Sequence, residues 1–174
     1  MKTLLLSIIL LFLSYVGVFA QSESILQFYD KYKQQENVTN VKMQGWVLKL
    51  ASNFSDDEEG KKLLEKITQL RVLVMEEGNL VSPDEYKSLV KKVGKDKFEL
   101  LMNLREGKEV IDIFIREDAE SITDVLLLVS GDDQFVLLSL EGKFQLSDLN
   151  DLDFDVEGAE HLKKIPEPKK TPRA

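Results

Sequence analysis

The sequence contains no cysteine and a single histidine, His161. Without cysteine the chain can form no disulfide, can use no thiol nucleophile and offers no site for lipid attachment of the bacterial type. One histidine cannot build a histidine-based zinc site, and the cysteine ligands that would replace histidine are missing. A chain of 174 residues must therefore be stabilised by a hydrophobic core rather than by cross-links.

The sequence is also short of positive charge, with 23 Lys and Arg against 31 Asp and Glu and a net charge of −8. This balance argues against nucleic acid as a partner, because phosphates demand a basic surface. It equally argues against general attraction to anionic membranes. No glycine-rich phosphate loop, GxSxG or HExxH occurs. We therefore assign no catalytic, cofactor-binding or metal-binding residue, expect no cofactor, and expect the protein not to be an enzyme.

The longest apolar run lies at the N-terminus. Lys2 is the only charge before Glu23, residues 4–13 are apolar except for Ser7, and Val18-Phe19-Ala20 places small residues before a possible cut. This arrangement is typical of a secretory signal peptide. We expect cleavage between Ala20 and Gln21 and a periplasmic or secreted protein. An uncleaved anchor is the alternative, but the run is short of the roughly 20 residues of a membrane span.

The rest of the chain is expected to form one domain, residues 21–157, followed by a flexible tail, residues 158–174, that is rich in proline and lysine. A helix is predicted from Ser24, because apolar residues recur on one face. A second apolar stripe is predicted to face the core; it consists of Val47, Leu50, Ala51 and Phe54. The spacing of Phe28, Tyr29, Tyr32 and Trp46 is likewise better explained by core packing than by an aromatic ligand platform.

Two capping boxes predict helix starts at Ser55 to Glu58 and at Ser82 to Glu85, the second with Pro83 at the first helical position and Gly94 as its stop. Between them, residues 70–75 indicate a buried strand. From Phe98 the apolar period changes to two, and turns separate four successive strands. Helices first and consecutive strands later predict an α+β domain, with an antiparallel meander of about four to six strands and helices packed on one face.

The stretch from Val125 to Leu149 (VLLLVSGDDQFVLLSLEGKFQLSDL) contains two apolar strands, a Gly-Asp-Asp turn and a closing Asp-Leu. With FYDKY, LRVLVMEE and ELLMNLREGKEVIDIFIRED earlier in the chain, it resembles the bacterial family catalogued as domain of unknown function 4252. The resemblance covers roughly Ser24 to Leu152. It implies an exported protein of Gram-negative bacteria with links to envelope stress responses. The family brings no established activity, so no functional residue is carried over.

Two acidic groups could bind a cation, but each has a simpler interpretation. Asp132 and Asp133 follow Gly131, and Gly and Asp are ordinary choices for a hairpin turn. Asp151 to Asp155 (DLDFD) resembles the start of a calcium loop, yet Val156 and Leu162 occupy the positions where such a loop needs Gly and Glu. His161 falls in the predicted tail, away from any Ser-His-Asp arrangement.

Three functions remain open. The first is a non-enzymatic envelope module that binds an envelope or secreted protein through a sheet face or an edge strand. The second is a carrier or sensor of a small apolar ligand held between helices and sheet. The third is a carboxylate-dependent hydrolase in which Asp112, Asp132 and Asp133 converge in a cleft. The sequence indicates no transmembrane span after cleavage and leaves the oligomeric state open.

Overall fold

The computed structural model describes residues 22–54, 56–119 and 121–150. The predicted leader and tail, the segment from Asp151 to Asp155 and His161 lie outside these residues. None of the helices in the described ranges is long and apolar enough to cross a membrane.

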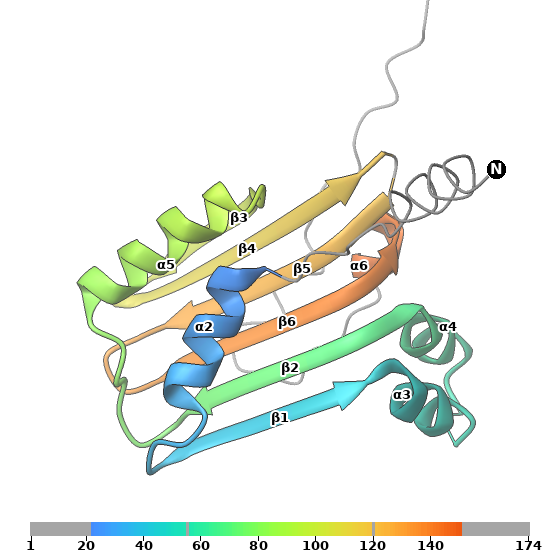
Figure 1. Ribbon diagram of the computed structural model, residues 1–174, viewed down its shortest axis with the longest axis horizontal. Helices are drawn as coiled ribbons and strands as arrows, with labels where there is room; N and C mark the ends of the chain where they lie inside the picture. Colours follow the sequence, from blue (N-terminus) through green and yellow to red (C-terminus); the bar gives the residue numbers. More distant parts are fainter. Residues whose placement is uncertain (1–21, 55, 120, 151–174) are drawn as a thin grey trace, which may run out of the picture.

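The elements alternate at first and then give way to consecutive strands (Figure 1). In chain order they are α2 (Glu23–Tyr32), β1 (Val38–Gln44), α3 (Gly45–Ser52), α4 (Glu58–Lys66), β2 (Ile67–Met75), α5 (Pro83–Lys95), β3 (Glu99–Glu106), β4 (Glu109–Asp118), β5 (Ser121–Ser130), β6 (Phe135–Phe144) and α6 (Leu146–Asn150).

The strands form one antiparallel sheet of six, in the order β1-β2-β6-β5-β4-β3. Strands β3 to β6 are the predicted meander, each paired with the next. The earlier pair β1–β2 joins it through β2 and β6, where Val72 lies opposite Leu138. The α+β prediction with an antiparallel meander is therefore confirmed.

Helices α2 and α5 cover one face of the sheet (Figure 1). Tyr29 and Tyr32 of α2, together with Leu89 and Val93 of α5, pack on strand residues such as Leu126. The spacing of Tyr29 and Tyr32 correctly predicted core packing, since both side chains are buried. Within the described ranges, this layer is one of two hydrophobic clusters.

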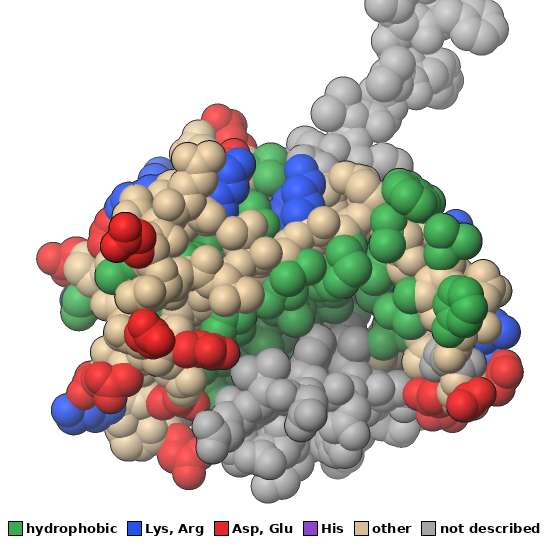
Figure 2. Space-filling model, turned by 90° about the horizontal axis from the view of Figure 1, so that it is seen from below, with side chains coloured by type: hydrophobic (Ala, Val, Ile, Leu, Met, Phe, Trp, Pro, Cys, Tyr) green, Lys and Arg blue, Asp and Glu red, His purple; other side chains and the backbone are tan. Residues whose placement is uncertain are grey.

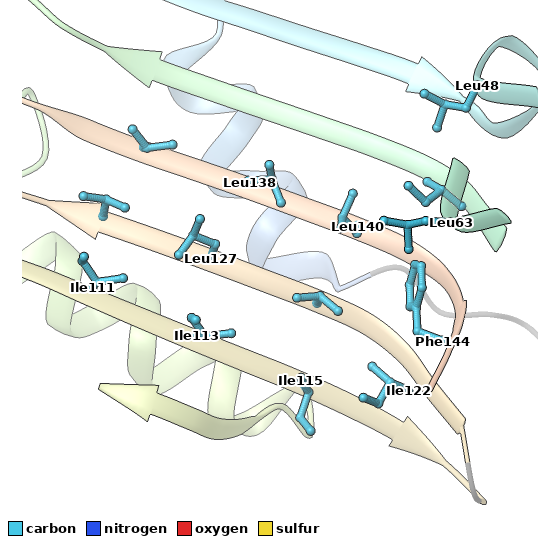
Figure 3. Packing of buried hydrophobic residues seen from close by; sticks show 14 residues of the cluster. Leu48, Leu63, Ile111, Ile113, Ile115, Ile122, Leu127, Leu138, Leu140 and Phe144 are labelled. Atoms are coloured by element: carbon cyan, nitrogen blue, oxygen red, sulfur yellow. The ribbon is translucent and has the colours of Figure 1, made fainter. Parts of the chain in front are cut away.

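The opposite face is apolar as well, which a sheet with one solvated face would not require. Its cluster includes Ile113, Leu127 and Leu138 from three neighbouring strands, all of them buried. Leu48 of α3 and Leu63 of α4 join this cluster at one end of the face (Figure 3). Because β5 and β6 are apolar on both faces, their sequences are nearly continuous apolar runs rather than alternating ones.

The helix starts agree only in part with the predicted capping boxes. At α5 both halves of the box form, since Ser82 accepts from the Glu85 amide while Glu85 accepts from the Ser82 amide. At α4 the N-cap is Asp57, not Ser55: its carboxylate accepts from the amides of Glu59 and Gly60. Asp is as good an N-cap as Ser, and moving the cap by two residues brings this carboxylate to the helix start.

Helix α5 continues past the predicted stop at Gly94. Helix α5 runs through Lys95, and the left-handed backbone position after it belongs to Lys97, with φ of 67°. Gly94 lies inside the last helical turn, where an added Cβ would meet no atom within 4 Å. Glycine is therefore not needed at this position.

Gly45 shows the opposite situation at the start of α3. A Cβ there would lie 2.6 Å from the carbonyl oxygen of Ile67 and 2.9 Å from the Cα of Thr68. Only glycine lets α3 approach the first residues of β2 this closely. This contact fixes which side of α3 faces the protein.

We expect Gly45→Ala to lower the free energy of unfolding by about 1–3 kcal/mol, because backbone atoms would have to move. Gly94→Ala is the matched control, and should raise it by up to about 1 kcal/mol because alanine favours a helix. Urea denaturation followed by circular dichroism measures both. Equal effects of the two substitutions would contradict the assignment of a tight α3–β2 contact.

Candidate binding sites

The first candidate site is an exposed apolar surface at the α3 end of the molecule. Trp46 and Leu50 of α3 are 67% and 54% exposed, and Phe54, just after the helix, is 88% exposed. We call these three side chains the α3 surface. Figure 2 shows hydrophobic side chains gathered at this end, with acidic side chains close by.

The orientation of α3 contradicts the apolar stripe expected from the sequence. The buried residues of α3 are Gly45, Leu48 and Ser52, whereas Leu50 and Phe54 of the predicted stripe point to solvent. Trp46, also expected in the core, is exposed with them. The physical reason is size, because small Gly45 and Ser52 let the helix lie close to the sheet. Close backbone approach at Gly45, together with the burial of Leu48 in the core, decided which side of α3 faces inward.

Acidic residues border the α3 surface on one side. Asp56, Asp57, Glu58 and Glu59 follow Phe54 in sequence, are exposed, and form the start of α4. Aromatic residues at the centre of a patch with polar residues at its edge are typical of protein interfaces. Large exposed apolar patches are uncommon on monomers and mark sites of association.

The second candidate site is a pocket of about 770 Å3 between α5, strands β3 and β4, and the β5–β6 turn. Its polar centre is Asp112 of β4, which is 5% exposed. The Tyr86 hydroxyl donates to Asp112 Oδ2 at 2.6 Å, and Asn103 Nδ2 donates to Oδ1 at 2.5 Å. Each oxygen of the carboxylate thus accepts one hydrogen bond from the protein.

The elements that carry these side chains explain why they meet. Asn103 lies directly opposite Asp112 in the β3–β4 register. Tyr86 stands one turn into α5, whose start is fixed by the Ser82 capping box and by Glu85. Burial raises the pKa of Tyr86 and its bond to Asp112 raises it further, so the hydroxyl keeps its proton and acts as a donor.

The pocket is bordered by positive charge although the chain as a whole is acidic. Lys87, Lys91, Arg105 and Lys108 line it, against two acidic residues, Asp112 and Asp132. Lys108 pairs with Asp132. Among the described residues, Lys91 and Arg105 have no ion-pair partner. The pocket therefore joins free cations at the edge to a hydrogen-bonded carboxylate inside.

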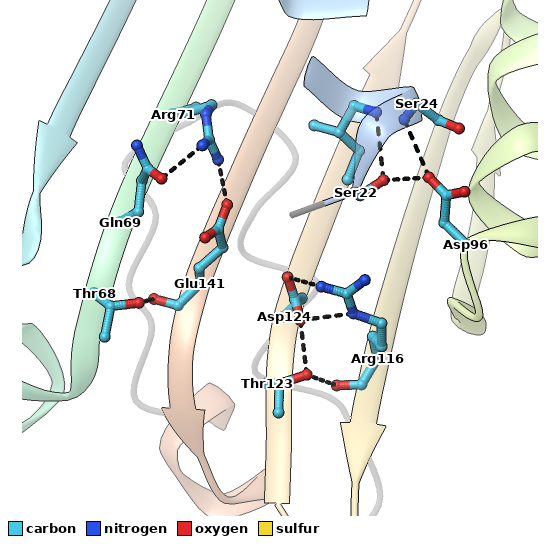
Figure 4. Close-up of polar contacts among 11 residues, drawn as sticks. Ser22, Ser24, Thr68, Gln69, Arg71, Asp96, Arg116, Thr123, Asp124 and Glu141 are labelled. Carbon is cyan, nitrogen blue, oxygen red and sulfur yellow. Dashed lines mark hydrogen bonds and ion pairs between the residues drawn. The ribbon is translucent and has the colours of Figure 1, made fainter. Parts of the chain in front are cut away.

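A third polar feature crosses four strands on the face that α2 and α5 cover (Figure 4). Arg116 forms a bidentate pair with Asp124, both contacts being 2.8 Å. Arg71, 1% exposed, donates to Glu141 at 2.5 Å and to Gln69 at 2.6 Å. Ion pairing and hydrogen bonds offset the cost of removing these charges from water.

The three acidic residues that the sequence analysis considered, Asp112, Asp132 and Asp133, do not form one site. Asp132 and Asp133 lie in the β5–β6 turn, where the Gly131 amide donates to the Gln134 carbonyl, as the turn interpretation expects. Asp112 and Asp132 line the same pocket, and Asp133 is not among its lining residues. In the described part of the chain, no group of three metal-ligating side chains occurs.

Sequence reasoning missed the Tyr86–Asp112 pair and the row of charges around Arg71. A polar residue inside an apolar strand was the available signal: Asp112 interrupts VIDIFI, and Arg71 interrupts LRVLVM. Such a residue must find a partner when it is buried. Its partner could not be found without the register and the helix positions.

Comparison with known proteins agrees with the resemblance noted in the sequence. The model of the family described as Domain of unknown function (DUF4252) matches residues 32–152. Neither the curated proteins nor the solved structures contain a match to this chain.

We expect Arg71→Met to lower the free energy of unfolding by about 3 kcal/mol, because Glu141 would keep a charge without its partner. The double variant Arg71→Met/Glu141→Met should lose less stability than Arg71→Met, because it leaves no unpaired charge behind. Lys87→Met is the control: its pair with Asp84 is solvent-exposed, and it should change stability by less than about 1 kcal/mol. Guanidinium denaturation of the wild type and the three variants measures the free energies of unfolding. A double variant less stable than Arg71→Met would contradict the prediction.

Proposed function

Because the chain belongs to the Domain of unknown function (DUF4252) family, which supplies no activity, we propose a function from the chain's own surface. The protein is an exported, non-enzymatic binding module of the cell envelope, acting in a regulatory or stress-response system. It binds an envelope or secreted protein through the α3 surface, Trp46, Leu50 and Phe54. The exposure of these three large apolar side chains is the observation that carries the proposal.

The chemistry of the surface defines the partner. Two aromatic side chains and a leucine suit an apolar groove, since aromatic anchors dominate the energetics of interfaces. The acidic run from Asp56 to Glu59 beside them suits Lys or Arg at the rim of that groove. The same run would be repelled by an anionic lipid surface, which favours a protein over a membrane as the partner.

The two alternatives gain less support. An apolar ligand would have to enter the layer between the helices and the sheet, where Leu73, Met75, Leu126 and Phe135 are fully buried and packed together. A hydrolase would need Asp112, Asp132 and Asp133 to converge in one cleft, whereas Asp133 does not line the pocket that the other two share, and Asp132 pairs with Lys108. The proposal without catalysis therefore rests on fewer assumptions.

Export is tested on the processed protein. We expect the chain recovered from the envelope or the medium to begin at Gln21, because small residues at Val18 and Ala20 suit signal peptidase. Intact-mass spectrometry of fractionated cells measures this. A variant with Ala20→Lys should accumulate in the uncleaved form. Full-length wild-type chain in the cytoplasmic fraction would contradict export.

Binding is tested with a photo-crosslinking residue in place of Leu50 in the full chain, expressed in its native cells. We expect one dominant crosslinked protein, which is then purified and titrated with the wild type. Trp46→Ser/Phe54→Ser should weaken that binding by at least about 30-fold, since each anchor contributes on the order of 1–2 kcal/mol or more. Asp56→Lys should weaken it further at low salt, by removing attraction to a basic rim.

Leu80→Ser/Leu100→Ser is the matched control, because both leucines are exposed, at 49% and 55%, and lie outside the α3 surface. This control should bind as the wild type does. If it loses as much affinity as Trp46→Ser/Phe54→Ser, the α3 surface is not the docking site. Binding of the wild type to phosphatidylglycerol vesicles, lost in Trp46→Ser/Phe54→Ser, would assign the surface to a membrane instead.

A further inference from the structure

The pocket beside α5 holds an arrangement of charges that the proposed protein-binding surface does not use. It lies at the edge formed by β3 and β4, whereas the α3 surface adjoins β1 and β2. Its lining combines free cations, a buried carboxylate and apolar side chains. Pockets that bind small molecules are typically of this size and carry a few convergent polar groups.

The cations of the pocket select an anion. Lys91 and Arg105, the two cations without an ion-pair partner among the described residues, lie on α5 and β3, on two different walls. Lys87, whose pair with Asp84 is long at 3.8 Å and exposed, adds a third positive charge. A carboxylate between α5 and β3 would be attracted from two sides, and the guanidinium of Arg105 could bind it through two parallel hydrogen bonds.

The interior of the pocket selects hydroxyl groups. Asp112 accepts one hydrogen bond at each oxygen, from Tyr86 and from Asn103, and each oxygen retains a further lone pair. A second anion cannot approach this carboxylate, but a hydroxyl donor can. Tyr86 and Asn103 hold the carboxylate in place, so its remaining acceptor positions are already oriented.

We propose that this pocket binds a small organic anion that carries hydroxyl groups, such as a sugar acid. The carboxylate of the ligand lies between Lys91 and Arg105, and its hydroxyl groups donate to Asp112. The apolar side chains of Val90 and Val110 contact its carbon chain. The site makes the protein a sensor or carrier of that class of compound, independently of any protein partner.

Three probes of six carbons separate the parts of this proposal. Gluconate has the carboxylate and the hydroxyl groups, glucitol has the hydroxyl groups alone, and hexanoate has the carboxylate alone. We expect gluconate to shift the backbone amide signals of Tyr86, Lys91, Arg105 and Asp112 in NMR titrations at millimolar concentration. Glucitol and hexanoate should bind at least about tenfold more weakly, because each lacks one set of charge-assisted hydrogen bonds.

Charge variants locate the site. Lys91→Glu/Arg105→Glu should weaken gluconate binding by at least about tenfold, and added salt should weaken the wild type in the same direction. Lys95→Glu/Lys97→Glu is the matched control, with the same change in net charge on exposed residues that do not line the pocket. Asp112→Asn should weaken the binding of gluconate and leave the binding of hexanoate unchanged. Both charge variants replace exposed side chains, so they report on the pocket even if Asp112→Asn fails to fold.

Three results would overturn the proposal. The first is a wild-type spectrum unchanged by gluconate. The second is an equal loss in Lys91→Glu/Arg105→Glu and in Lys95→Glu/Lys97→Glu, which would indicate diffuse attraction to positive charge. The third is hexanoate binding as tightly as gluconate, which would remove Asp112 from recognition. None of these results concerns binding at the α3 surface, so the two proposals are tested independently.

Discussion

The pairing of β2 with β6 is the constraint on which the rest of the structure depends. It joins the β1–β2 pair, with its helices, to the meander that ends in β6. Its register places Gln69 opposite Glu141 and Leu73 opposite Leu137. The pair Leu73 and Leu137 thereby joins the hydrophobic layer beneath α2 and α5. The pair Gln69 and Glu141 surrounds Arg71 with polar partners. A slip of one residue would exchange the two faces.

Charge serves different purposes in different parts of this acidic protein. Near Arg71 each buried charge has a partner, and the arrangement contributes to the fold. At the start of α5, Lys31 and Ser82 lower the pKa of Glu85 to about 2, and this carboxylate links α2 to the helix that forms a wall of the pocket. In the pocket itself, Lys91 and Arg105 have no ion-pair partner among the residues that the structure describes. These two cations leave interaction capacity for a ligand.

The two proposed sites arise from different features of the fold. The α3 surface exists because Gly45 and Ser52 let the helix pack by its small side, which leaves Trp46 and Phe54 outside. The pocket exists because α5 is held at its start by the capping box and stands beside the polar pair of β3 and β4.

The class of fold, the helix that starts at Ser82, the four strands of the meander and the turn at Asp132 were all predictable from the sequence, because capping, periodicity and turn chemistry depend on a few neighbouring residues. The same reasoning failed for α3, where the close approach of Gly45 to β2 and the burial of Leu48 turned most of the apolar stripe toward solvent. The exposure of Trp46, the bond between Tyr86 and Asp112, and the presence of Arg105 and Lys91 in the lining of one pocket followed from the tertiary structure alone. These outcomes depend on register and on the close approach of distant backbone segments, and no local pattern contains either.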